Sequence, residues 1–134
     1  MTLFHPLLVH FPVGLWVTSF FFDTLNLLRP DTPMYPRVSF WLIGLGLLGA
    51  AVSIPGGWLD YLRLLRQGVA DPFGRVVFVH QVLAYATTAV YLAIFLLRWR
   101  RPALPRGPRF ALALLAAGLI AATAWYGTTA RNMV

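Results

Sequence analysis

The chain has 134 residues, of which 59% are hydrophobic and only 11% are charged, and its mean hydropathy is +0.71. A soluble domain carries about 25% charged residues, so this composition excludes a soluble globular fold and predicts a single integral membrane domain over residues 1–134. The net charge is +7. The chain contains no cysteine, and this excludes thiolate-held iron–sulfur clusters, thiolate zinc sites and covalently attached haem.

Four apolar runs are predicted to be membrane-spanning helices. They cover about residues 3–28, 38–59, 76–97 and 110–126, and loops rich in proline or arginine separate them. A bilayer requires about 20 apolar residues per span, so the chain has room for four spans and little else. Because short loops join consecutive spans, the sequence predicts an all-α four-helix transmembrane bundle with up-down-up-down topology.

The first run carries polar residues that a membrane span seldom contains. It begins with the segment HPLLVHFP at residues 5–12, and Asp23 follows near its other end. An ionisable group inside a span is a functional hypothesis by default, so His5 and His10 are the first candidate site residues. Asp23 is expected either to be capped by the following loop or to pair with an arginine at that end of the span.

The second run combines a face of small residues with a polar end. Membrane helices use such faces to approach one another closely, and we expect this one to pack against another helix. The segment IPGG at residues 54–57 is expected to loosen the helix just before Asp60, which closes the run. The small residues that share the face are Gly46, Gly49, Ala50 and Ser53.

The arginines are distributed unequally between the two sides of the predicted bundle. Four spans place both termini and the second loop on one side, where we count four arginines, against seven on the other. Cytoplasmic loops are enriched in arginine and lysine, so the termini are expected outside the cytoplasm. Because these arginines lie in short loops rather than on a basic helix face, we discount nucleic acid as a partner. The richer side holds Arg29, Arg37, Arg98, Arg100, Arg101, Arg106 and Arg109, and the other holds Arg63, Arg66, Arg75 and Arg131.

The same topology brings the histidines and one carboxylate to the outer end. His80 lies about one turn inside the third span, which enters from the same side as the first, so His10 and His80 are expected at similar depth. Asp60 ends the second span at this level. Gly14 and Ala84 each follow a histidine by four residues and lie one turn deeper on the same face. Their small side chains predict a slot that suits a flat macrocycle such as haem.

These motifs resemble the bacterial membrane family catalogued as domain of unknown function 2231. The resemblance rests on HPLLVHFP at residues 5–12 with Asp23 in the first span, on GWLD at residues 57–60, and on Arg75 with His80 at the start of the third span. It covers nearly the whole chain and is most specific in the first span. It implies four spans in the bacterial inner membrane and no settled activity. Members joined to electron-transfer domains favour redox work.

We therefore predict a membrane redox protein that binds one b-type haem between the first and third spans, near the outer face. His10 and His80 are the predicted axial ligands, because haem iron accepts neutral imidazole. Gly14 and Ala84 leave room for the macrocycle, and Arg75 is placed to hold a propionate. The expected partners are the lipid bilayer and an electron-transfer protein or a quinone.

Two alternatives stay open. In the first, three imidazoles and a carboxylate bind a transition-metal ion such as zinc, copper or iron. In the second, the chain is a non-catalytic membrane subunit whose histidines form a structural hydrogen-bond network. No nucleophile–base pair and no paired catalytic carboxylates are evident, which gives no support to a hydrolase; whether the chain is an enzyme, and its oligomeric state, stay open. The metal ligands of the first alternative are His5, His10, His80 and Asp60.

Overall fold

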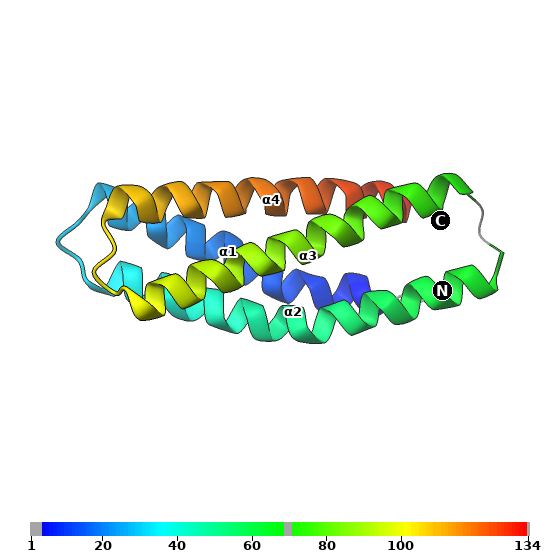
Figure 1. Ribbon diagram of the computed structural model, residues 1–134, viewed down its shortest axis with the longest axis horizontal. Coiled ribbons are helices and arrows are strands. Elements are labelled where there is room, and N and C mark those ends of the chain that lie inside the picture. Colours follow the sequence, from blue (N-terminus) through cyan, green and yellow to red (C-terminus); the bar gives the residue numbers. More distant parts are fainter. Residues whose placement is uncertain (1–3, 69–70, 134) are drawn as a thin grey trace.

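The protein is an elongated bundle of four antiparallel α-helices (Figure 1). The computed structural model describes residues 4–68 and 71–133, except for the side chains of residues 4–7, 64 and 71–73. All four helices are long and apolar enough to cross a membrane, which confirms the predicted all-α bundle. The helices are α1 (Phe4–Leu28), α2 (Met34–Arg66), α3 (Asp71–Arg100) and α4 (Arg106–Asn132).

The helices extend further than the apolar runs because the prolines interrupt them less than expected. Pro36 and Pro108 lie in the first turns of α2 and α4, where a missing N–H group costs nothing. Pro55 lies inside α2, and the predicted loosening at residues 54–57 does not end the helix. The connections at one end of the bundle shorten to residues 29–33 and 101–105. We call this end the two-loop end, and the end where α1 begins and α4 ends the terminal end.

Each helix packs against two neighbours. The most extensive contacts join α1 to α2, followed by those between α3 and α4, while α2 and α3 share the least surface. Within the described residues, the backbones of α1 and α3 lie diagonally across the bundle and do not approach closely, and the same is true of α2 and α4. The diagonal helices α1 and α3 meet through long side chains. The bundle is therefore two helical hairpins joined mainly through α1 and α4.

Glycines on α2 allow the closest of these approaches. A Cβ atom added to Gly46 would collide with the indole of Trp16, and one added to Gly49 would lie 2.8 Å from the ring of Phe11 and 3.1 Å from Pro12. Large α1 side chains thus occupy the space that the small residues of α2 leave. The prediction that this small-residue face packs against another helix is confirmed.

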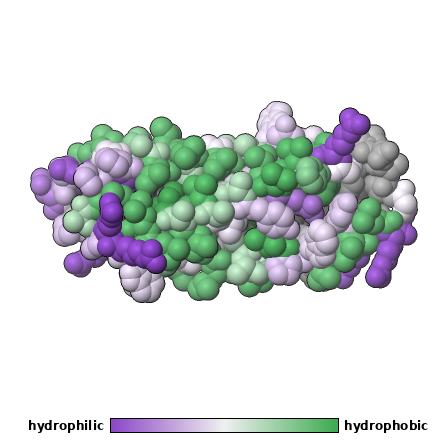
Figure 2. All heavy atoms as spheres, in the orientation of Figure 1, coloured by the Kyte–Doolittle hydropathy of each residue, from purple (hydrophilic) through white to green (hydrophobic). Residues whose placement is uncertain are grey.

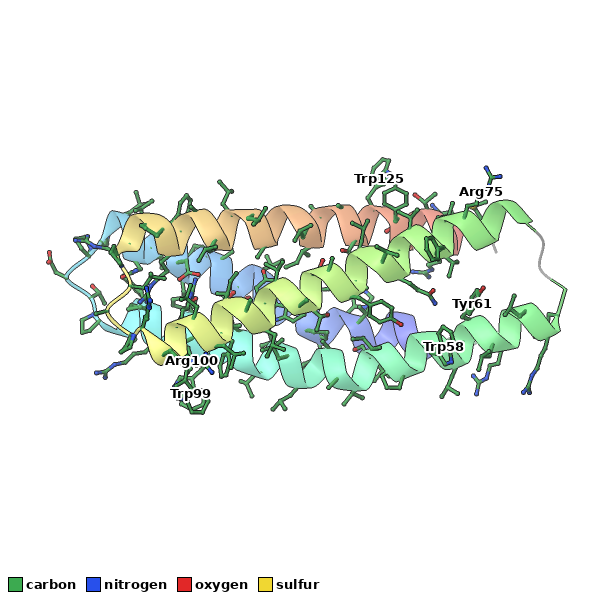
Figure 3. All side chains as sticks on the ribbon, in the orientation of Figure 1. Trp58, Tyr61, Arg75, Trp99, Arg100 and Trp125 are labelled. Atoms are coloured by element: carbon green, nitrogen blue, oxygen red, sulfur yellow. The ribbon has the colours of Figure 1, made fainter. Side chains whose placement is uncertain are left out.

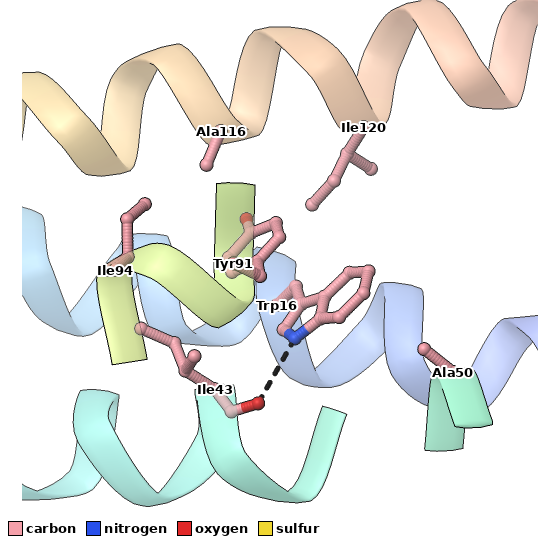
Figure 4. Packing of buried hydrophobic residues seen from close by; sticks show 7 residues of the cluster. All are labelled: Trp16, Ile43, Ala50, Tyr91, Ile94, Ala116 and Ile120. Atoms are coloured by element: carbon pink, nitrogen blue, oxygen red, sulfur yellow. Dashed lines mark hydrogen bonds between the residues drawn. The ribbon is translucent and has the colours of Figure 1, made fainter. Parts of the chain in front are cut away.

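The middle of the bundle is an apolar core to which every helix contributes (Figure 4). The rings of Trp16 and Tyr91 stack with centroids 4.2 Å apart and planes 5° from parallel. The Trp16 indole N–H donates a hydrogen bond to the carbonyl of Ile43 at 3.3 Å, which satisfies a polar group that lipid cannot. Polar residues gather toward the ends, while apolar side chains cover most of the middle of the face in Figure 2.

Candidate cofactor site and buried ion pair

His80 is held against α4 near the terminal end. Its Nδ1 atom lies 3.0 Å from the carbonyl oxygen of Thr123. A Cβ atom added to Gly127 would come within 2.9 Å of the His80 ring carbon Cε1. The imidazole therefore lies directly over the backbone of α4, in a space that exists because residue 127 has no side chain.

This hydrogen bond also determines which ring nitrogen of His80 carries the proton. A carbonyl oxygen only accepts, so Nδ1 must be the donor. In the neutral imidazole the lone pair is then on Nε2. Histidines that ligate metal or haem iron are commonly held in this way, with the other N–H donated to a backbone carbonyl. His80 is consequently held in an orientation in which Nε2 is the acceptor nitrogen of the ring.

A short polar seam continues from His80 toward the core. The hydroxyl of Thr123 lies 2.9 Å from the hydroxyl of Thr87, and each hydroxyl is also within 2.7 Å of a carbonyl in its own helix. Thr87 follows His80 by seven residues and lies on the same face of α3. Thus the polar groups between α3 and α4 satisfy one another at this level, as a low-dielectric interior requires.

His10 and Gly14 lie on the outer face of α1. Both are exposed, whereas Pro12 and Trp16, on the opposite side of the helix, are buried. A Cβ atom added to Gly14 would meet nothing within 4 Å. His80, in contrast, lies on the inner face of α3. The structure therefore does not place His10 and Gly14 on the interior surface that holds His80.

The remaining predicted site residues are spread around the terminal end. Asp60 is buried, and one of its carboxylate oxygens lies 3.5 Å from Arg63 one turn later. Ala84 is half-buried one turn beyond His80. Arg75 is exposed and points away from the bundle in Figure 3. The side chain of His5 lies outside the described residues.

No group of three possible metal ligands forms among the side chains that the structure describes. These described side chains include those of His10, His80 and Asp60, three of the four predicted metal ligands, but not that of His5. The described ligands therefore make no metal centre by themselves. His80 has the imidazole orientation that would allow it to hold haem iron. His10 lies on the exposed face of α1, the helix diagonal to α3.

A buried ion pair joins the helices at the two-loop end. The two terminal nitrogens of Arg98 donate to the two carboxylate oxygens of Asp23, at 3.1 and 2.8 Å. Arg98 also donates to the hydroxyl of Ser39 at 2.9 Å and reaches the carbonyl of Arg109 at 3.5 Å. The side chains of Asp23 and Arg98 are 1% and 2% exposed. One guanidinium thus connects all four helices.

This buried cluster was predictable from the sequence only in part. The prediction that Asp23 pairs with an arginine is confirmed, while capping by the following loop is not what the structure shows. The contributions of Ser39 and Arg109 were missed. Residues seven positions apart lie on the same face of a helix. Ser39 lies seven residues before the buried Gly46 on α2, and Arg109 lies seven residues before the buried Ala116 on α4. This spacing was the available indication that both residues are buried.

The His80 site and the Asp23–Arg98 ion pair are separated by about the thickness of a membrane. Eighteen residues separate Arg98 from His80 along α3, and at about 1.5 Å per residue this is about 27 Å. The hydrocarbon core of a bilayer is about 30 Å thick. Exposed tryptophans mark both levels, with Trp99 near the ion pair and Trp58 and Trp125 toward the terminal end (Figure 3), as expected for interfacial aromatic belts.

The fold and the arrangement of its polar residues define a class, that of small four-span membrane proteins with a polar site at each membrane interface. Within this class the chain belongs to the family described as "Predicted membrane protein (DUF2231)", whose model matches residues 2–133. The family resemblance noted in the sequence is thereby confirmed. No curated protein and no solved structure matches the chain.

Proposed function

We propose that this chain is a small membrane electron-transfer protein that binds one b-type haem at its terminal end, with His80 as an axial ligand. The observation that carries the proposal is the 3.0 Å contact between His80 Nδ1 and the carbonyl of Thr123. It orients the ring and makes Nε2 the nitrogen whose lone pair would coordinate iron. Haem, when bound, supplies the one-electron chemistry, and the protein holds and orients it.

His10 is the second axial ligand in this proposal, and it must turn toward α3 to serve. Pro12 lies inside α1 and has no N–H group for the carbonyl of residue 8, so the turns that carry His10 bend more readily than the rest of the helix. Two imidazoles can hold a macrocycle between them only if their helices stand apart. The diagonal arrangement of α1 and α3 meets this condition.

The surroundings of His80 suit exchange of electrons at one membrane face. His80 lies at the level of the aromatic belt that includes Trp58 and Trp125. A soluble electron carrier can approach this level from water, and a quinone can approach it from lipid. Arg75 and Arg131 are exposed at this end and supply cations for propionates or for an acidic partner.

We also propose an orientation in the bacterial inner membrane. Both loops of the two-loop end, with the adjoining helix ends, carry seven of the eleven arginines. The positive-inside rule places that end in the cytoplasm. The termini and His80 then face outward, where an extracytoplasmic electron carrier would find the haem.

The test is the visible absorption spectrum of the purified chain after expression with added haem. We expect a red protein whose Soret band sharpens and shifts on reduction with dithionite. His80→Ala should abolish the band and His10→Ala should shift or weaken it, because each removes one ligand. The control is Gln81→Ala, the neighbour of His80 with similar burial, which should leave the spectrum unchanged.

Two other outcomes would replace the haem proposal. A colourless wild-type protein with a stoichiometric transition metal by elemental analysis would favour the metal site of His10, His80, His5 and Asp60. A colourless, metal-free protein would favour a non-catalytic membrane subunit in which His80 only bonds to α4.

A further inference from the structure

The first turn of α4 presents an unusual electrostatic arrangement. It contains Arg106 and Arg109 but no acidic residue, and the N-cap, Pro105, makes no side-chain hydrogen bond to the helix. The N-terminus of a helix carries a partial positive charge and backbone N–H groups without intrahelical acceptors. Cations are therefore unfavourable at this end, and an anion would be favourable.

Buried charges beside this turn are also unbalanced. Arg98 and Arg109 are both buried, and both carboxylate oxygens of Asp23 are directed at Arg98. Arg109 donates to the uncharged carbonyls of Pro102 and Leu104. Its Nε atom is buried and has no hydrogen-bond partner in the structure. Among the described residues of this cluster, two guanidiniums thus share one carboxylate, and an unpaired buried charge is costly.

The surface around the same turn is cationic and lies at the membrane interface. Arg100, Arg101 and Arg106 are exposed, and none of them forms an ion pair with a carboxylate that the structure describes. Trp99, exposed next to Arg100 (Figure 3), sits where aromatic side chains meet lipid headgroups. Gly107 is exposed, and a Cβ atom added to it would meet nothing within 4 Å, so no side chain covers this position of the turn.

We propose that the N-terminus of α4 binds an anionic phosphate group, supplied either by the headgroup of an anionic phospholipid or by free phosphate. Helix N-termini bind phosphate through backbone N–H groups and the helix dipole, and guanidiniums bind phosphate oxygens with charge-assisted hydrogen bonds. The bound anion also compensates the surplus charge of Arg98 and Arg109. Arg98, beside this site, is about 27 Å from His80 along α3, so the site is independent of the haem proposal.

The probes are dioleoylphosphatidylglycerol, dioleoylphosphatidylcholine and inorganic phosphate, each added to the full chain purified in neutral detergent. Native mass spectrometry counts retained lipid, and thermal denaturation reports stabilisation by phosphate at constant ionic strength. We expect phosphatidylglycerol to be retained in preference to phosphatidylcholine. Each arginine removed should weaken binding about fivefold, so a triple Arg→Gln variant should lose roughly 100-fold. The three replaced residues are Arg100, Arg101 and Arg106.

The matched control replaces three exposed arginines at the terminal end, Arg66, Arg75 and Arg131, by glutamine. The net charge falls equally, so a specific site predicts that this control retains phosphatidylglycerol. Arg106→Gln alone, checked for an unchanged melting temperature, serves if the triple variant is unstable. If inorganic phosphate stabilises the wild-type protein but not Arg106→Gln, free phosphate is the source of the bound anion. Equal losses in both triple variants, or no preference for either anion over phosphatidylcholine, would overturn the proposal.

Discussion

The position of His80 depends on the absence of a side chain at Gly127. Gly127→Ala would place a methyl group 2.9 Å from the imidazole, so the ring must move and its bond to Thr123 must lengthen. We expect a loss of about 1–3 kcal/mol in unfolding free energy, typical of overpacking, and a changed haem spectrum. Gly118→Ala is the control, because nothing lies within 4 Å of its added Cβ. It should be neutral or stabilising by up to about 1 kcal/mol, and equal effects of the two substitutions would contradict the proposed contact.

Arg98 should be the most sensitive cation in the chain. Arg98→Gln leaves the buried carboxylate of Asp23 without its partner, and breaking such a pair costs about 3–5 kcal/mol. Arg98→Lys should recover only part of this loss, because lysine cannot form the two parallel hydrogen bonds. In thermal denaturation in detergent, the melting temperature should fall in the order wild type, Arg98→Lys, Arg98→Gln. Exposed Arg100→Gln should change stability by less than about 0.5 kcal/mol; a similar loss at both positions would show that the ion pair contributes little.

Single residues also show where sequence reasoning reached its limit. The pairing of Asp23 followed from its charge, because an ionised group in a span needs a partner. The direction of His10 did not follow. In a helix that is apolar on every side, rotation about its axis is set by packing, here by Trp16 against Gly46, and no amphipathic pattern reveals it.

At the scale of elements, the α1–α2 hairpin is the tightest unit of the bundle, and α2 supplies the space for it. Gly49→Leu would drive a branched side chain into Phe11 and Pro12, since even a Cβ atom there lies 2.8 Å from the Phe11 ring. We expect a loss of about 3 kcal/mol, seen as a lower melting temperature in detergent. Gly118→Leu, on the exposed side of α4, controls for added bulk. Unchanged stability of Gly49→Leu would show that the two helices do not approach as closely as described.

The ends of the elements were harder to predict than their number. Apolar length gave four spans directly. The predicted second run, 38–59, already included Pro55, but α2 begins earlier, at Met34, and ends later, at Arg66. Prolines are tolerated in membrane helices because neighbouring helices satisfy the freed backbone groups. Pro36 and Pro108, which lie outside the predicted runs, are therefore part of the first turns of α2 and α4.

For the whole molecule, the arginine distribution predicts one orientation. The chain has no cysteine, so single cysteines at exposed Gln67 and Ala103 report on the terminal and two-loop ends without background. With intact cells, an impermeant maleimide should label Gln67→Cys, while Ala103→Cys should react only after permeabilisation. The reverse pattern would place the two-loop end outside and contradict the proposed topology.

The measurement that tests the central claim most directly is a haem titration of the purified full chain, followed by its Soret absorbance. The account predicts saturation at one haem per chain, with a bis-imidazole spectrum. It also predicts no specific binding by His80→Ala and full binding by Gln81→Ala. A wild-type protein whose titration is indistinguishable from that of haem in empty detergent micelles would contradict the account.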